Sequence, residues 1–220
     1  MMQAGASDRG RDFAARWAEV IFTHQQATPL MQAFYEDIKG RMAGQYGRPP
    51  EECAILPSIE VFVDRTADAA AELAAELDSL VDPAMGLDVV GSAFGRNLSD
   101  VPLDTPVSQI EVGPSGPVGA GVYQNIIGTR KDGRELTLGE AAVLQASTWL
   151  SPRLVGDAVS VVDQMEDMFV ARGCDGFVVT HALSPQMLQN FVDLVVPELQ
   201  RRGLYRDAYT GTTFRDHLRS

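Results

Sequence analysis

The sequence predicts an α/β fold in which parallel strands alternate with helices. Residues 174–180 form a short, mostly apolar run typical of a buried strand. Amphipathic helices are predicted on both sides of it, at 156–172 and from Ser184-Pro185 onward. In the second helix the apolar residues recur at spacings of three and one, which is typical of a helix lying on a sheet or barrel. Helix, strand and helix within about fifty residues indicate an α/β unit.

The first eighty residues repeat this alternation. The predicted elements are, in order, the end of a strand at 2–5, a helix at 10–17, a strand at 19–23, a helix at 28–46, a strand at 54–63 and a helix at 66–80. In the helix at 10–17, Phe13 and Trp17 are expected to face the core. Pro49 and Pro50 end the helix at 28–46, because proline cannot continue one. Strands joined by helices rather than by hairpins are expected to be parallel.

The periodicity is lost between residues 82 and 136, a stretch rich in glycine and proline. A long segment of this kind in a compact domain is usually a functional lid or a disordered region. We therefore expect an insertion at 82–136 that covers the carboxyl ends of the strands. A helix is predicted to follow at 137–150, before the C-terminal unit.

Composition excludes several classes of protein. The net charge of −12 argues against nucleic-acid binding, which needs a basic face. No apolar run approaches the roughly 20 residues of a membrane helix, and the first residues have no apolar segment of a signal peptide. Cys53 and Cys174 lie far apart, without metal-site spacing, and are expected to be buried thiols. We expect a cytoplasmic protein with no membrane or nucleic-acid partner.

The sequence of the C-terminal third also resembles that of a known family. LVGDAVSVVDQMEDMFVARGCDGFVVT, then LQNFVDLVVPELQRRGLYR and YTGTTFRDHL, resemble the C-terminal end of the bacterial-luciferase-like flavin-dependent monooxygenases. The branch that fits best includes nitrilotriacetate and dibenzothiophene-sulfone monooxygenases. One departure is Gly156-Asp157-Ala158, where the family usually has Gly-Thr-Pro. Asp157 can still cap the following helix.

The resemblance implies that residues 1–220 are the C-terminal half of a (β/α)8 TIM-type barrel, a chain shortened at its N-terminal side. Within it, 82–136 would be the insertion or lid, and 137–220 the C-terminal helices and last strand. An unpaired sheet edge in such a half predicts association, most simply as a homo-oligomer.

The activity implied is that of a two-component flavin-dependent monooxygenase. It would use reduced FMN, supplied as a cosubstrate by a separate NAD(P)H:flavin reductase, and O2 to oxygenate a small organic substrate. Two alternatives stay open: a non-catalytic remnant or association module without turnover of its own, and an unrelated α/β binding module.

The predicted cofactor site lies at residues 3–11, Gln-Ala-Gly-Ala-Ser-Asp-Arg-Gly-Arg. A strand end, a glycine turn and a helix N-terminus present free amides and a partial positive charge, which suit a phosphate. An ordinary helix cap at Ser7 explains the same residues. The resemblance places the flavin phosphate on Ala6 and Ser7, and we assign Gly10 and Arg11 to the same site.

No catalytic residue is predicted. His24 and His181 each follow a predicted strand, where active sites of barrels gather. His24 is interpreted as a loop histidine, and His181 as a loop residue or a substrate-pocket residue. The histidines have no metal-site spacing, and nothing resembles a Ser-His-Asp arrangement.

Overall fold

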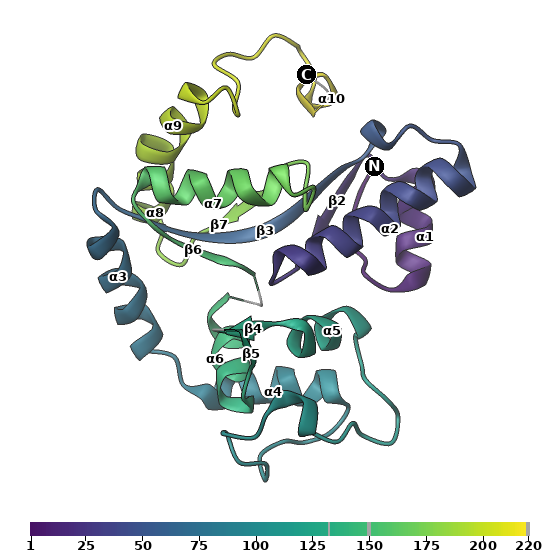
Figure 1. The fold of residues 1–220 in the computed structure, drawn as a ribbon, viewed down its shortest axis with the longest axis vertical. Coiled ribbons are helices and arrows are strands. Elements are labelled where there is room, and N and C mark those ends of the chain that lie inside the picture. The colour runs from purple at the N-terminus through teal and green to yellow at the C-terminus, as the bar shows by residue number, and fades with distance from the viewer. Residues whose placement is uncertain (132, 149–150, 219–220) are drawn as a thin grey trace.

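A parallel sheet organises the molecule. The computed structural model describes residues 1–131, 133–148 and 151–218. Strands β1 (Met2–Gln3), β2 (Val20–Thr23) and β3 (Ala54–Val63) follow one another in space, and β6 (Arg153–Gly156) and β7 (Val178–Thr180) both pair with β3. Every pairing in this sheet is parallel (Figure 1). The predicted α/β class is confirmed.

Strand β3 is the central strand of the sheet because other strands pair with both of its edges. Its even-numbered amides point to one edge, where Ala54 N donates to Glu19 O and Glu60 N donates to Pro152 O. Its odd-numbered groups point to the other edge, where Ile55 O accepts from Asp175 N. The first edge therefore carries β2 and then β6 along its length, and the second edge carries β7.

Helices cover both faces of the sheet. The helices outside the insertion are α1 (Asp8–Trp17), α2 (Thr28–Tyr46), α3 (Ala67–Ser79), α7 (Ala158–Val170), α8 (Gln186–Asn190), α9 (Val196–Arg201) and α10 (Phe214–Leu218), with a π-helical turn at Phe191–Val195 and a 3-10 turn at Pro50–Glu52. Helices α1 and α2 pack on β2 and the start of β3. Helices α7 and α9 pack on the end of β3, and α3 and α8 cover the opposite face of that end.

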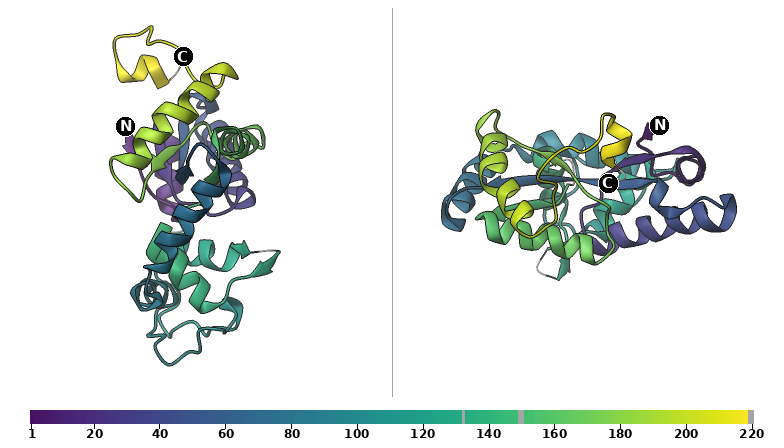
Figure 2. Two further views of the ribbon diagram at one scale, coloured as in Figure 1. Left: turned by 90° about the vertical axis from the view of Figure 1, so that its left-hand side faces the viewer. Right: turned by 90° about the horizontal axis from the view of Figure 1, so that it is seen from above.

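Residues 82–136 are more ordered than the sequence suggested. They contain α4 (Pro83–Phe94), a 3-10 turn at Val107–Gln109, α5 (Ala120–Gly128) and a hairpin of β4 (Arg130–Lys131) and β5 (Arg134–Glu135). With α6 (Leu138–Thr148) they bury their own core, which includes Val90, Phe94, Ile126 and Leu138. This insertion lobe projects from the sheet as a separate body (Figures 1 and 2). The expectation of an irregular segment was wrong, since glycines and prolines here flank helices.

Several details correct the sequence analysis. Phe13 and Trp17 face outward, 47% and 51% exposed, because the alanines of α1 make the contact with the sheet. Strand β6 was not predicted, since its four residues are too short for a pattern. The predicted helix at 137–150 is α6, and residues 149–150 lie outside the described residues.

Asp175 ties α2 to the sheet. Its carboxylate lies 2.8 Å from Lys39 Nζ and accepts hydrogen bonds of 2.8 Å from Tyr35 Oη and the amide of Ile55. The Lys39 ammonium, whose side chain is 10% exposed, also donates to the carbonyls of Pro50 and Cys53.

Burial raises the pKa of the Cys53 thiol to about 11 and that of Cys174 to about 12. Both cysteines are buried and free of disulfides, as predicted.

Three strands of the described sheet have an open edge. The outer edges of β1, β6 and β7 each pair with no other strand among the described residues. Large apolar side chains are exposed on α1 (Phe13 and Trp17) and on the segment after β7 (Leu188 and Val192). An unpaired edge beside an apolar surface favours association.

We therefore expect the 220-residue chain to be a dimer or a larger species in solution. Size-exclusion chromatography with light scattering measures this directly. Replacing Phe13 and Trp17 together by serine should shift the population toward monomer, whereas Leu80→Ser, at an exposed residue at the end of α3, should not. A compact wild-type monomer would contradict the expectation.

Candidate functional site

The loops after β1, β2, β3 and β7 meet at one end of the sheet because these strands are parallel. In barrels built from parallel strands, active sites lie at this carboxyl end. The residues singled out from the sequence fall here: Ala6 and Ser7 follow β1, His24 follows β2, and His181 follows β7. The fold thus brings to one end residues that are up to 175 positions apart in the chain.

The predicted phosphate site is a tight turn leading into α1. Ser7 is the N-cap of this helix, and its Oγ accepts a hydrogen bond of 3.1 Å from the amide of Gly10. A Cβ on Gly10 would lie 3.1 Å from Ser7 Oγ and 3.4 Å from the backbone of Gly5. Gly5 and Gly10 thus let the turn fold back closely on the start of the helix. The turn forms a small cradle of backbone at the positive end of the helix dipole.

Arg11 holds this turn in place. Its Nε donates to the carbonyl of Ala6 at 2.9 Å, and its Nη1 is 3.0 Å from the carboxylate of Asp37 on α2. The guanidinium also lies over the ring of Phe34, 5.0 Å from the ring centroid. Arg11 thus fixes the carbonyl of Ala6, which keeps the amides of the turn on the other side of the chain.

The insertion lobe contacts the same turn. A Cβ on Gly121, in the first turn of α5, would lie 2.7 Å from the Cβ of Ala6. Further along α5, the Asn125 side chain accepts from the amide of Gln26 at 2.8 Å and donates to the carbonyl of His24. Helix α5 therefore lies against the loops that follow both β1 and β2. This contact was not visible in the sequence, because it depends on the path of the lobe.

His24 lies at the end of β2, and the lobe sets its orientation. Its Nδ1 is 3.1 Å from the hydroxyl of Ser151, a residue 1% exposed just after the lobe. The ring stands edge-on to Phe22, with centroids 4.7 Å apart. Partial burial lowers the pKa of His24 below its ordinary value, so the ring is neutral at pH 7. This is a more constrained environment than that of an ordinary loop histidine.

A metal centre is not supported by the part of the chain that the structure describes, where no group of three His, Cys, Asp or Glu residues could hold an ion. Similarly, no helix among the described residues is long and apolar enough to span a bilayer.

His181 follows β7, and its Nδ1 is buried without a hydrogen-bond partner among the described residues.

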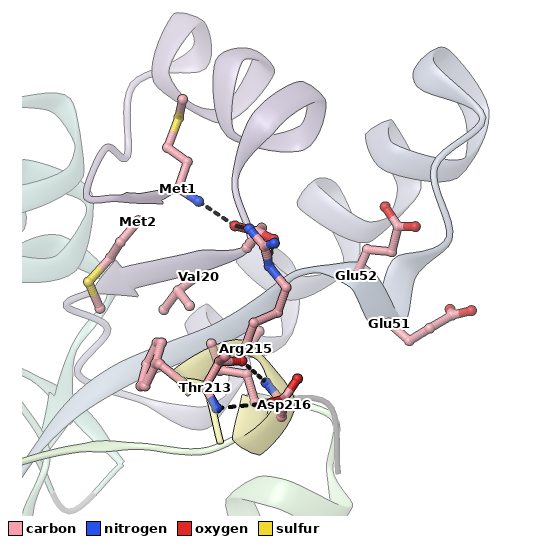
Figure 3. A pocket seen from close by; sticks show the side chains of 12 residues that line it. Met1, Met2, Val20, Glu51, Glu52, Thr213, Arg215 and Asp216 are labelled. Atoms are coloured by element: carbon pink, nitrogen blue, oxygen red, sulfur yellow. Dashed lines mark hydrogen bonds and ion pairs between the residues drawn. The ribbon is translucent and has the colours of Figure 1, made fainter. Parts of the chain in front are cut away.

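A hollow of about 540 Å³ lies at the other end of the sheet. Its walls include Met1, Val20 and Glu52, and the C-terminal segment around Arg215 closes it (Figure 3). Glu19 holds that segment, because its carboxylate is 2.7 Å from Arg215 Nε. The hollow faces the amino ends of the strands, away from Ser7 and His24, so we do not assign the site to it.

Comparison with known proteins decides the family. The model for the luciferase-like monooxygenases matches residues 1–176 of the chain. The chain belongs to the luciferase-like monooxygenase family. The resemblance predicted from the C-terminal third is therefore confirmed, and the match extends over the turn at residues 3–11 and the insertion lobe.

Relatives of this luciferase-like chain include members of the predicted branch. It is 35% identical to nitrilotriacetate monooxygenase component A of Aminobacter aminovorans and 34% identical to dibenzothiophene-sulfone monooxygenase of Rhodococcus erythropolis. Each alignment covers 99% of this chain and 48% of the relative. The crystal structure of DmoA from Hyphomicrobium sulfonivorans superposes with a TM-score of 0.80 at 26% identity, over 99% of this chain and 44% of that one.

This luciferase-like chain thus spans about half the length of the curated relatives it matches. The predicted fold, half of a TIM-type barrel with parallel strands and a long insertion, is confirmed by the sheet and by these matches. In the described part of the sheet, β3 pairs with β2, β7 and β6 in turn along its length, and β6 pairs with its last four residues.

Proposed function

We propose that this chain is a polypeptide of a two-component flavin-dependent monooxygenase, in which Ala6, Ser7, Gly10 and Arg11 hold the phosphate of FMN. The cradle at the start of α1 carries the proposal, because it combines a hydroxyl, backbone amides and a helix N-terminus at the carboxyl end of a strand. The name of one relative, component A, fits a system in which a separate protein supplies the reduced flavin.

The residues of the turn fit a phosphate group. The absence of a Cβ at Gly5 and Gly10 leaves the backbone open beside Ser7, and a helix N-terminus favours an anion. Arg11 would support the phosphate site indirectly. It donates to the carbonyl of Ala6 and pairs with Asp37, so it holds the turn in place. Ser7 would exchange its bond to the Gly10 amide for a bond to a phosphate oxygen.

Reduced FMN, when bound, supplies the electrons that activate O2 for transfer to the organic substrate. The part of the chain described here would bind and orient the flavin and exclude water from it. The turn would fix the phosphate, and the lobe would cover the loops after β1 and β2. We propose a cytoplasmic enzyme whose partners are a small organic substrate, O2 and a NAD(P)H:flavin reductase.

A second candidate is a non-catalytic association module. The open edges of β1 and β7 favour it, together with a chain that spans about half of its relatives. In this case the protein would assemble through those edges and show no turnover of its own. Flavin binding separates the two candidates.

We expect the 220-residue chain to bind FMN weakly, with a Kd of about 1 mM. A few hydrogen bonds of about 0.5–3 kcal/mol each must offset at least about 4 kcal/mol of lost translational and rotational freedom. In ¹⁵N-resolved NMR titrations, FMN and inorganic phosphate should both shift the amides of residues 7–11. Ser7→Ala should weaken the effect about tenfold.

Thr66→Ala is the matched control for this prediction. Thr66 caps α3 as Ser7 caps α1, by accepting a hydrogen bond from the amide of Ala69. Both substitutions should cost about 1 kcal/mol of stability, but only Ser7→Ala should change flavin binding. Micromolar binding by the chain alone, or shifts confined to other residues, would show that the flavin anchor lies elsewhere.

A further inference from the structure

The register shows which side chains lie on the face of the sheet opposite α1, α2, α7 and α9, here called the inner face. Ile21 on β2 packs against the outer helices, and so do Ile55, Ile59 and Val61 on β3. Because side chains alternate along a strand, Phe22 and His24 face inward, as do Leu56 and Ser58. Thr23 is paired with Pro57, and His24 follows directly after β2 with its ring against Phe22, so continuing the register places His24 beside Ser58 on this inner face.

Ser58 is an unusual residue for such a position. It is fully buried, and its Oγ has no hydrogen-bond partner among the described residues. A buried hydroxyl without a partner destabilises a fold, so its presence needs an explanation. Ser58 was not singled out from the sequence, because a lone serine in an apolar strand carries no pattern.

His24 is oriented so that one ring nitrogen stays available. Nδ1 is engaged with the buried Ser151, and Asn125 holds the backbone carbonyl of His24. No described residue bonds Nε2, and the side chain is exposed at the end of the strand. The ring is neutral, with its pKa lowered by partial burial, so Nε2 presents a hydrogen-bonding group without a charge.

The surrounding inner face carries no unpaired charge. Glu60 and Arg153 are its charged residues in the described strands, and Arg153 Nε lies 3.0 Å from the Glu60 carboxylate. Arg153 also pairs with Asp78 at 2.6 Å. The inward positions that neighbour His24 and Ser58 are apolar, namely Phe22, Leu56 and Val178. Burying a carboxylate here would leave it without a cation, which is strongly unfavourable.

We propose that His24 and Ser58 form a polar subsite that orients an uncharged hydrogen-bond acceptor, such as a sulfone or a carbonyl oxygen, of the organic substrate. That the bound molecule is a substrate rests on the proposed function, but the binding chemistry of the subsite does not. The Ser58 hydroxyl donates to the acceptor, His24 Nε2 completes the contact, and the apolar neighbours hold the rest of the molecule. Ser151 and Asn125 position the ring without touching the ligand.

The experiment uses dimethyl sulfone as the neutral probe and malonate as the charged one. The chain holds three histidines, so ring resonances in a histidine-labelled sample are assigned by single replacements. Dimethyl sulfone should shift the His24 ring resonances saturably, and malonate should not. Ser58→Ala should weaken the sulfone effect at least threefold, and His24→Gln should weaken sulfone binding as reported by the amides of Leu56 and Ser58.

Folding of the variants is checked in the same samples. Ser58→Ala removes an unpartnered hydroxyl and should leave the unfolding midpoint unchanged or higher. Ser79→Ala, an exposed serine on α3, is the control that should leave sulfone binding unchanged. No saturable His24 shift with sulfone, an equal response to malonate, or full sulfone binding by Ser58→Ala would each overturn the proposal. Flavin binding at residues 7–11 is measured separately, so failure of one assignment leaves the other standing.

Discussion

Gly86→Ala is expected to unfold the insertion lobe while the sheet remains folded. Gly86 lies in α4 where this helix crosses α6, and a Cβ there would be 1.9 Å from the carbonyl oxygen of Ala142. Backbone cannot move aside as a side-chain tip can, so the two helices must separate. The lobe core between them, including Val90 and Leu138, would then open. We expect a loss of at least about 3 kcal/mol, the upper part of the range for overpacked cores.

Hydrogen exchange locates the effect, because amides of α4 and α6 should lose protection while those of α2 keep it. Gly40→Ala on α2 is the matched control. A Cβ at Gly40 meets no atom within 4 Å, so alanine should stabilise that helix by about 0.5–1 kcal/mol. Retention of full protection in the lobe of Gly86→Ala would show that α4 and α6 do not pack this closely.

Asp175→Asn is expected to lower the free energy of unfolding by about 2–3 kcal/mol. The substitution keeps the shape but leaves the ammonium of Lys39 without its counter-charge, and weakens the bond from Tyr35. Breaking a buried pair costs about 3–5 kcal/mol. We place the loss below that range because the Asp175 side chain is 28% exposed and solvent screens the pair.

Urea denaturation measures this loss, and Asp163→Asn supplies the comparison. Asp163 pairs with Arg202 in an equally short contact, but its side chain is 58% exposed. Arg202 also keeps Glu166 and Glu198 as partners. Asp163→Asn should therefore cost less than about 0.5 kcal/mol. Equal losses in the two variants would mean that Asp175 is only a surface partner.

Elements with strong local signals were predicted correctly from the sequence. The bounds of α2 and β3 match the predicted 28–46 and 54–63, because a proline in the first turn, Gly47 at the C-cap and a run of apolar residues mark them. Ser7 as a helix cap was found for the same reason, since capping needs neighbouring residues alone. The family followed from a long ordered match in the C-terminal third.

Features that depend on distant residues were missed. Strand β6 is a strand because β3 extends beyond its other partners and offers an edge to it. The lobe helices α4 and α5 contain glycines, and at Gly86 and Gly121 these permit close contact with other parts of the chain. His24 lies in a loop, as interpreted, but its contact with Ser151, 127 positions away, leaves no sign in the sequence.

The use of both edges of β3 has a consequence for the order of folding. Its partner β2 lies close in sequence, but β6 and β7 arrive only after the chain has passed through the lobe. Contacts between segments so far apart form slowly, because a long loop must close first. The lobe core is assembled from residues 90–141 and is local by comparison. A lobe that folds early shortens the effective loop and brings β6 to its place, so slowing the lobe should slow completion of the sheet.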